Sequence, residues 1–360
     1  MGGIYFSAAV SSSLLWGLFP VLGRYMQTRE AGRPSSVSLI FVVCAFDTVL
    51  IGVYMVFAQL VRSSPAEALL PSPSDSRKLN VTLAYGLLCL GRMLSNMQST
   101  RMTTALNVQM TAMLVPFVTA AAARIALGEH IDRALPSTLL LTLAGCMLIL
   151  AGQGAFSSDS TLRRVGLMDL AGIGMQLVST LFSAAIKVYW RTSEGILSKD
   201  ELLIAQFAVG AVPTGCYCVL YDRASLTAIA QMDAVGWILL VILAVGVYIF
   251  GNLLQMIATR GIGAANATAT HSVRLVAASA AGWALLGEPI ATGLEWAGIA
   301  AIVGTLTAFY VVQACRERAT AQHGPAADLP QVAVTKVHFD GTSHNDEESR
   351  SIVSADPDAT

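Results

Sequence analysis

Residues 101–131, RMTTALNVQMTAMLVPFVTAAAARIALGEHI, recur as residues 260–290, RGIGAANATATHSVRLVAASAAGWALLGEPI, at an offset of 159 positions. Each copy predicts an apolar helix of about twenty residues that ends in Leu-Gly-Glu and leads into another apolar helix. Identical residues at this offset, in and just beyond the copies, are Arg101/Arg260, Ala105/Ala264, Asn107/Asn266, Thr111/Thr270, Gly128/Gly287, Glu129/Glu288 and Gly145/Gly304. This repetition indicates a duplicated membrane unit.

The composition agrees with a membrane protein. The chain has 360 residues, of which 54% are hydrophobic and 12% charged, and its mean hydropathy is +0.62. Soluble domains carry about 25% charged residues, so this chain has too few to cover itself with solvated surface. Residues 315–360 hold four Lys/Arg and eight Asp/Glu, which leaves eighteen and fifteen for the rest. That near-balance argues against nucleic acid as a partner.

Ten apolar segments have about the twenty residues that a helix needs to cross a hydrocarbon core of about 30 Å. They span residues 4–27, 37–61, 81–100, 105–127, 135–155, 165–189, 201–221, 234–257, 263–286 and 293–314. We therefore expect an all-α polytopic membrane protein with ten transmembrane helices. The polar, acidic tail that follows has no apolar periodicity to bury, and we expect it to be disordered.

The chain divides into a first repeat (residues 1–155), a Ser-rich linker (156–164), a second repeat (165–314) and the tail (315–360). Because each repeat holds five predicted helices, the second enters the membrane from the opposite side, which makes an inverted repeat. With the N-terminus in the cytosol, nine Lys/Arg fall on the inner side and six in outer loops. This bias favours both termini in the cytosol.

Several of these features together resemble a known family. Two five-helix repeats, Trp16-Gly17 in the first predicted helix, Pro116 in the fourth, and Leu-Gly-Glu closing the fourth and ninth are similar to the EamA branch of the drug/metabolite transporter superfamily. The resemblance covers residues 4–314. It implies a central cavity lined by helices one to four and six to nine, with helices five and ten peripheral. One departure is Leu275, beside Arg274, at the position that matches Pro116.

The resemblance implies a secondary transporter, driven by a gradient or by exchange, that moves a small organic metabolite by alternating access. A nucleotide-sugar or phosphorylated-metabolite antiporter of the same superfamily is one alternative. A non-transporting membrane adaptor, whose acidic tail recruits partners, is another. The sequence has no Gly-rich phosphate loop, no His-Glu-x-x-His and no cysteine pair with zinc spacing. We therefore expect no enzymatic activity, cofactor or metal.

Charged residues inside the predicted helices are the candidates for substrate binding. An Arg at the bilayer centre costs about 2.5–3.5 kcal/mol on insertion scales, so it usually faces a cavity or a partner. Arg92 and Arg274 lie near the middle of their segments, and we interpret them as a pair that binds an anionic group. The alternative is that Asp47 neutralises one of them. For Asp47, this structural role is favoured over that of a proton-coupling carboxylate.

Three further residues complete the candidates. His271 titrates near neutral pH in an ordinary setting, but a hydrogen bond between helices is the favoured role. Lys187 lies near the end of its segment, where its side chain is expected to reach the membrane interface. Trp16 lies beside Gly17 and Pro20, either next to the cavity at a kink or as a packing or interface anchor. The predicted substrate-binding residues are Arg92, Arg274, His271, Asp47 and Trp16.

The repeated motif residues are assigned structural roles. Glu129 and Glu288 each precede a helix, where a carboxylate is favoured by the helix dipole and can cap free N–H groups. Asn107 and Asn266 begin the repeated helices, where capping and hydrogen bonding between helices outrank substrate contact. The motif residues with an expected structural role are Asn107, Pro116, Gly128, Glu129, Asn266, Gly287 and Glu288.

The expected partners are a small molecule, anionic if the two arginines bind it, and the lipid bilayer. A homodimer remains open. So does the membrane itself, since the sequence does not distinguish the plasma membrane from the Golgi or another endomembrane.

Accessibility labelling tests the predicted topology. Single cysteines introduced near the N-terminus and at residue 350 should both react with a membrane-impermeant reagent only after the cells are permeabilised. The physical reason is that an even number of spans returns the chain to its starting side. Labelling of the two positions on opposite faces would rule out ten spans.

Overall fold

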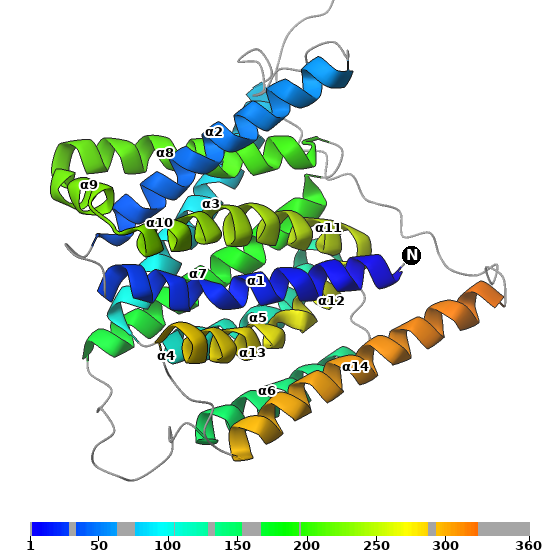
Figure 1. Cartoon of the computed structure of the whole chain (residues 1–360). Helices are drawn as coiled ribbons and strands as arrows, with labels where there is room; N and C mark the ends of the chain where they lie inside the picture. The colour runs from blue at the N-terminus through cyan, green and yellow to red at the C-terminus, as the bar shows by residue number, and fades with distance from the viewer. Residues whose placement is uncertain are drawn as a thin grey trace, which may run out of the picture. The chain divides into compact units, whose positions relative to one another are not determined.

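The fold is that of a helical protein. In this computed structural model the described residues are 2–28, 34–62, 76–103, 105–128, 134–152, 167–193, 196–286 and 293–322, and within them no strand occurs. The first repeat contains α1 (Gly2–Thr28), α2 (Ser36–Arg62), α3 (Ser76–Met102), α4 (Ala105–Ala112), α5 (Val115–Leu127) and α6 (Ala134–Gly152). The second contains α7 (Leu167–Thr192), α8 (Lys199–Tyr221), α9 (Arg223–Ala230), α10 (Ala234–Val241), η1 (Ile242–Gly251), α11 (Asn252–Ile262), α12 (Ala264–Ala269), η2 (Thr270–Ser272), α13 (Val273–Ala281), η3 (Gly282–Leu286) and α14 (Gly293–Gln322) (Figure 1).

Five helical stretches within the described ranges are long and apolar enough to cross a membrane. They are Gly3–Thr28, Ser36–Phe57, Leu167–Thr192, Lys199–Tyr221 and Ala234–Ile262. On α2, the large side chains of Phe46, Val49, Val53 and Phe57 are exposed, which suits contact with lipid rather than water. These are the features of an all-α membrane protein. Of the other predicted spans, α3 is a continuous helix of 27 residues but is more polar, and the apolar helices Val115–Leu127, Leu135–Gly145 and Trp296–Phe309 are shorter. The count of ten therefore stays a prediction.

The predicted helix 105–127 is interrupted in the structure. α4 ends at Ala112, and α5 begins at Val115 with Pro116 in its first turn. Proline has no backbone N–H to donate to the carbonyl four residues earlier, so a continuous helix would lose a hydrogen bond here. At the other end Gly128 adopts φ 63° and its N–H donates to the carbonyl of Ala123. The glycine of Leu-Gly-Glu thus ends the helix in a left-handed cap.

The equivalent helix of the second repeat, predicted over 263–286, is interrupted at the same place without a proline. The 3₁₀ turn Thr270–Ser272 corresponds, at the offset of 159, to residues 111–113. The Thr270 hydroxyl lies 3.1 Å from the carbonyl oxygen of Ala267 and 3.2 Å from that of Ala9 in α1. Hydrogen bonds of a Ser or Thr side chain to nearby carbonyls compete with regular helix geometry. Segment 234–257 is also irregular, because the π-helix η1 lies between α10 and α11.

The contacts that α1 makes with the second repeat correspond to the contacts that α7 makes with the first. α1 of the first repeat packs against α13, η1 and α11 of the second. α7 of the second repeat packs against α3, α4 and α5 of the first. α2 packs against α8, as Figure 1 shows, and α5 packs against α12. α1 and α7 thus hold equivalent positions, each embedded in the opposite repeat.

Gly17 allows α1 to approach α13 closely. A Cβ atom at this position would lie 2.5 Å from the carbonyl oxygen of Arg274 and 2.5 Å from Cβ of Ala277. Any side chain would push the backbone of α13 away. The neighbouring Trp16 and Phe19 belong to the main hydrophobic core, together with residues of α2, α3, α8 and η1.

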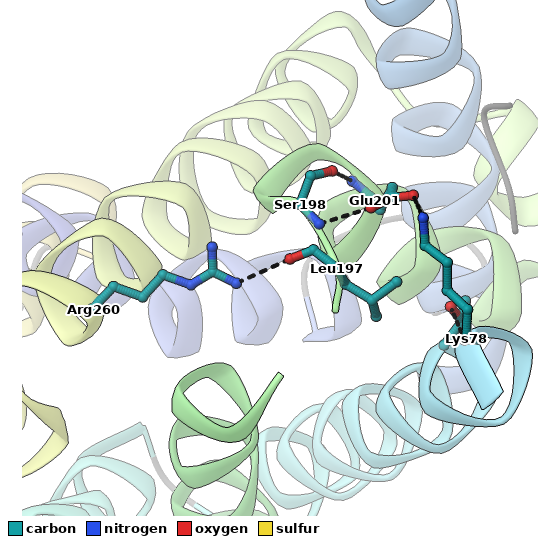
Figure 2. Close-up of polar contacts among 6 residues, drawn as sticks. Lys78, Leu197, Ser198, Glu201 and Arg260 are labelled. Atoms are coloured by element: carbon teal, nitrogen blue, oxygen red, sulfur yellow. Dashed lines mark hydrogen bonds and ion pairs between the residues drawn. The ribbon is translucent and has the colours of Figure 1, made fainter. Parts of the chain in front are cut away.

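Polar contacts link the repeats at both ends of α8. Figure 2 shows the first end, where Lys78 of α3 forms an ion pair of 2.5 Å with Glu201. Glu201 also accepts from the N–H of Ser198 in a capping box. At the other end, Asp222 accepts hydrogen bonds from Ser225 and from Ser35, which precedes α2. Burial raises the pKa of Asp222, but these hydrogen bonds outweigh it and hold that pKa below its ordinary value.

Several predicted features fall elsewhere or outside the described residues. α14 continues to Gln322, so helix extends past the predicted start of the tail at 315. The rest of the tail, the linker 156–164, Glu129, Gly287 and Glu288 lie outside the described residues.

Replacing Gly17 by alanine tests the close approach of α1 and α13. Because the new methyl group would meet a backbone oxygen, we expect Gly17→Ala to lower stability by about 1–3 kcal/mol, the usual effect of overpacking. Gly52→Ala in α2 is the matched control, since a Cβ there meets nothing within 4 Å. Thermal unfolding of the purified proteins in detergent measures both. Equal melting temperatures for the two variants would contradict this packing.

Candidate functional site

A group of basic side chains lies buried where the two repeats meet. Arg92 of α3 comes from the first repeat, and Lys187 of α7, His271 of η2 and Arg274 of α13 come from the second. Arg92, Lys187 and His271 are 5%, 2% and 1% exposed, while Arg274 is partly buried. We refer to these four residues as the basic cluster. His271 lies in the 3₁₀ turn and Arg274 just after it, so the interruption of the helix brings their side chains into the interior.

Three donors converge on one nitrogen of His271. Its Nε2 lies 2.8 Å from Nε2 of Gln255, 3.0 Å from a terminal nitrogen of Arg274 and 3.4 Å from Nζ of Lys187. Arginine and lysine can only donate, so this nitrogen must be the acceptor and the ring neutral, with its proton on Nδ1. One lone pair cannot satisfy three donors. The site therefore has donor capacity to spare.

The ring of Trp16 lies close to both arginines. The guanidinium carbon of Arg92 is 4.8 Å from the centroid of the Trp16 ring, and that of Arg274 is 5.5 Å away. The negative face of an indole ring attracts such cations, by more when they are shielded from water. Trp16 in turn contacts Tyr248 edge-on at 5.5 Å. Trp16 is 4% exposed and so is not an interface anchor.

Unsatisfied groups in the site are mostly donors. Arg92 donates to Oδ1 of Asn252 at 3.2 Å. Among the described residues, no partner is found for Nε of Arg92, Nε of Arg274, Nδ1 of His271, Nε1 of Trp16 or Nδ2 of Asn252. No carboxylate of the described residues pairs with the basic cluster. A buried site that offers many donors and positive charge, with few acceptors, suits an anionic group.

Asp47 does not neutralise either arginine in this conformation. Its side chain is fully buried on α2, and neither of its oxygens has a hydrogen-bond partner among the described residues. The favoured interpretation of Asp47 as a structural counter-charge does not hold here, because α2 presents it to the apolar core and away from hydrogen-bonding distance of the guanidinium groups.

The interface role expected for Lys187 is also wrong. The lysine is five residues from the end of α7, but α7 packs against α3, α4 and α5 of the first repeat, so this face of the helix is buried. His271 does form the expected hydrogen bond between helices, with Gln255 of α11.

The motif residues take local structural positions. Nδ2 of Asn107 donates to Oγ1 of Thr103 at 2.9 Å, and Nδ2 of Asn266 donates to the carbonyl of Ile262 at 3.1 Å. Thr103 and Ile262 correspond at the offset of 159, so the two asparagines bond to equivalent positions just before their helices. Pro116 lines a small cavity with Met113, Phe117, Leu139, Thr142, Leu143, Ala269 and Ser272. Its volume of about 10 Å³ has room for about one water molecule.

Sequence reasoning missed Asn252, Gln255 and Tyr248. A signal was available for the first two, because they are polar, three positions apart and inside an apolar run, which places them on one face of a helix. Tyr248 gave no such signal, since a tyrosine in an apolar helix is ordinary.

Comparisons with known proteins add a likeness of fold. No protein-family model matches the chain, and none of the curated proteins matches it. Among solved structures, 24 chains match. One of them, described only as the crystal structure of a protein, has a TM-score of 0.60 and 14% sequence identity, covering 84% of this chain and 94% of that one. At this identity the likeness shows a shared helical fold and carries no activity or substrate.

Proposed function

We propose that this protein is a secondary transporter that carries a small organic anion across a membrane by alternating access between its two repeats. The observation that carries the proposal is the basic cluster. Arg92, Lys187 and Arg274 bring three positive side chains into the interior from both repeats, without a bonded carboxylate among the described residues. A charge inside a membrane protein is costly to keep and usually marks the path of a substrate or ion.

The arrangement of the helices supports alternating access. The contacts of α1 with the second repeat correspond to those of α7 with the first, as expected if the repeats can exchange conformations. Each repeat also has a helix that is interrupted at the equivalent position, after Ala112 and after Ala269. Interrupted helices at the interface of repeats are typical of substrate sites in such transporters.

The count of charges favours a substrate with a phosphate or two carboxylates over a monocarboxylate. Arginine binds carboxylate and phosphate through a planar fork, and Lys187 adds a point charge. A phosphorylated metabolite therefore belongs to the proposed substrate class. A non-transporting adaptor would have no use for an unpaired buried cluster, since removing it would relieve the cost of burial.

Substitution of Arg274 tests binding of an anion. Arg274→Leu should weaken binding of inorganic phosphate or malate by about ten- to a hundredfold, because a charge-assisted hydrogen bond contributes about 1.5–3 kcal/mol. Arg274→Lys should lie between the wild type and Arg274→Leu, since it keeps the charge and loses the fork. Binding is measured as the rise in melting temperature with anion concentration, and uptake in proteoliposomes.

Arg124→Leu is the control, because Arg124 is exposed in the last turn of α5. The free protein should not lose stability in Arg274→Leu, because no carboxylate is left unpaired. Normal uptake of both anions by the Arg274→Leu protein would end the binding-site interpretation.

The ion pair of Lys78 with Glu201 offers a test of alternating access. Lys78→Ala should favour conformations in which the first turns of α3 and α8 separate, since the pair holds them together here. Hydrogen–deuterium exchange in these turns should rise, while overall stability should change by less than about 1 kcal/mol, as for other partly exposed pairs. Lys78→Arg keeps the charge and serves as the control. Unchanged exchange in Lys78→Ala would show that these turns do not separate.

A further inference from the structure

Asp47 is an acid in the core that the proposed anion site does not use. It lies on the buried face of α2, in line with Ile40, Cys44 and Ile51 at helical spacing, and is 0% exposed. Both of its oxygens are without a hydrogen-bond partner among the described residues. An ionised carboxylate in such a place is strongly disfavoured, and the group binds a proton instead. In this conformation Asp47 is therefore a neutral carboxylic acid.

The groups that face Asp47 do not supply a positive partner. Cys44 is on the same helix, and Tyr248 of η1 is within electrostatic range of Cys44, Asp47 and Arg92. On α3, Cys89 is within electrostatic range of Cys44, and Arg92 is within electrostatic range of Tyr248. On α8, Gly210 packs against the sulfur of Cys44. The charged side chains of α8 and α9 are at the ends of these helices: Lys199, Asp200, Glu201 and Arg223.

Tyr248 connects this acid with the basic cluster. Its ring contacts Trp16, which is close to both arginines, and its own hydroxyl has no partner among the described residues. The π-helical backbone of η1 is the kind of irregular segment that often occurs at functional sites.

We propose that Asp47 is the proton-binding site of the transporter and that one proton moves with each anion in the same direction. The inference rests on the proposed function. An ionised Asp47 and a bound anion would place two negative charges in the same low-dielectric interior, so they would repel each other. The anion therefore binds better when Asp47 is protonated, and by reciprocity the proton binds better when the anion is present. Proton and anion then cross together, and both leave when water reaches the site from the other side.

Infrared spectroscopy tests the protonation of Asp47 without any ligand. The full-length wild-type protein at neutral pH should show the C=O stretching band of a protonated carboxylic acid, and Asp47→Asn should lack it. Asp233→Asn is the control, because Asp233 is an exposed N-cap of α10 and asparagine caps helices as well. A wild-type spectrum without the band, or a band that persists in Asp47→Asn, would overturn the proposal.

Transport of radiolabelled phosphate and malate in proteoliposomes tests the coupling. With the membrane potential held at zero, an inward gradient of one pH unit should drive about tenfold accumulation of the transported anion in the wild type, as one-to-one coupling requires. Asp47→Asn should lose this accumulation and keep exchange of anion for anion. Gradient-driven accumulation by Asp47→Asn equal to that of the wild type would overturn the proposal. A wild type that exchanges neither anion would overturn the proposed function and the coupling with it, whereas exchange without the infrared band would overturn only the role of Asp47.

Discussion

The interior of this membrane protein is arranged around three basic side chains whose burial has to be stabilised. Arg92, Lys187 and Arg274 are held by one neutral histidine, the amide of Asn252 and the ring of Trp16, and no carboxylate among the described residues bonds to them. Each of these partners offers a partial negative charge, which reduces the cost of burial without cancelling the positive charge. A bound anion would supply the negative charge that the described residues do not place beside these three side chains. Stability and binding are therefore in opposition at this site, as is common at functional sites.

Close packing of the two repeats makes this arrangement feasible. Because Gly17 has no side chain, α1 approaches the backbone of Arg274, and this contact allows the neighbouring Trp16 to lie close to both guanidinium groups. The interruption at Thr270–Ser272 places His271 against Gln255. Close packing at Gly17 and the irregular turn at Thr270–Ser272 therefore position the basic side chains without a salt bridge to a carboxylate of the described residues.

The sequence was sufficient for much of the fold, because apolar length and the offset of 159 depend on local composition and duplication alone. It predicted the helical segments and the glycine that ends α5. Asn107 and Asn266, which were expected to cap helices or to bond between helices, instead donate to residues four positions earlier. It did not predict the interruption at Thr270–Ser272, because no proline marks it. It also did not predict that Lys187 is buried, because the position of a residue along a helix does not show which face of that helix packs against its neighbours. The neighbours of Asp47 follow from packing between distant segments, which one sequence does not specify.

The two repeats make corresponding contacts with each other and are unlike in chemistry. Pro116 interrupts the helix of the first repeat, and the equivalent turn of the second carries His271 and Arg274, where the first has Ala112 and Val115. Exchange of conformations needs only similar backbones, since the energies of the two end states depend on the same set of contacts between repeats. A second set of charges at Ala112 and Val115 would add repulsion to a cluster that has no bonded carboxylate among the described residues, so the asymmetry limits the cost of burying positive charge where the repeats meet.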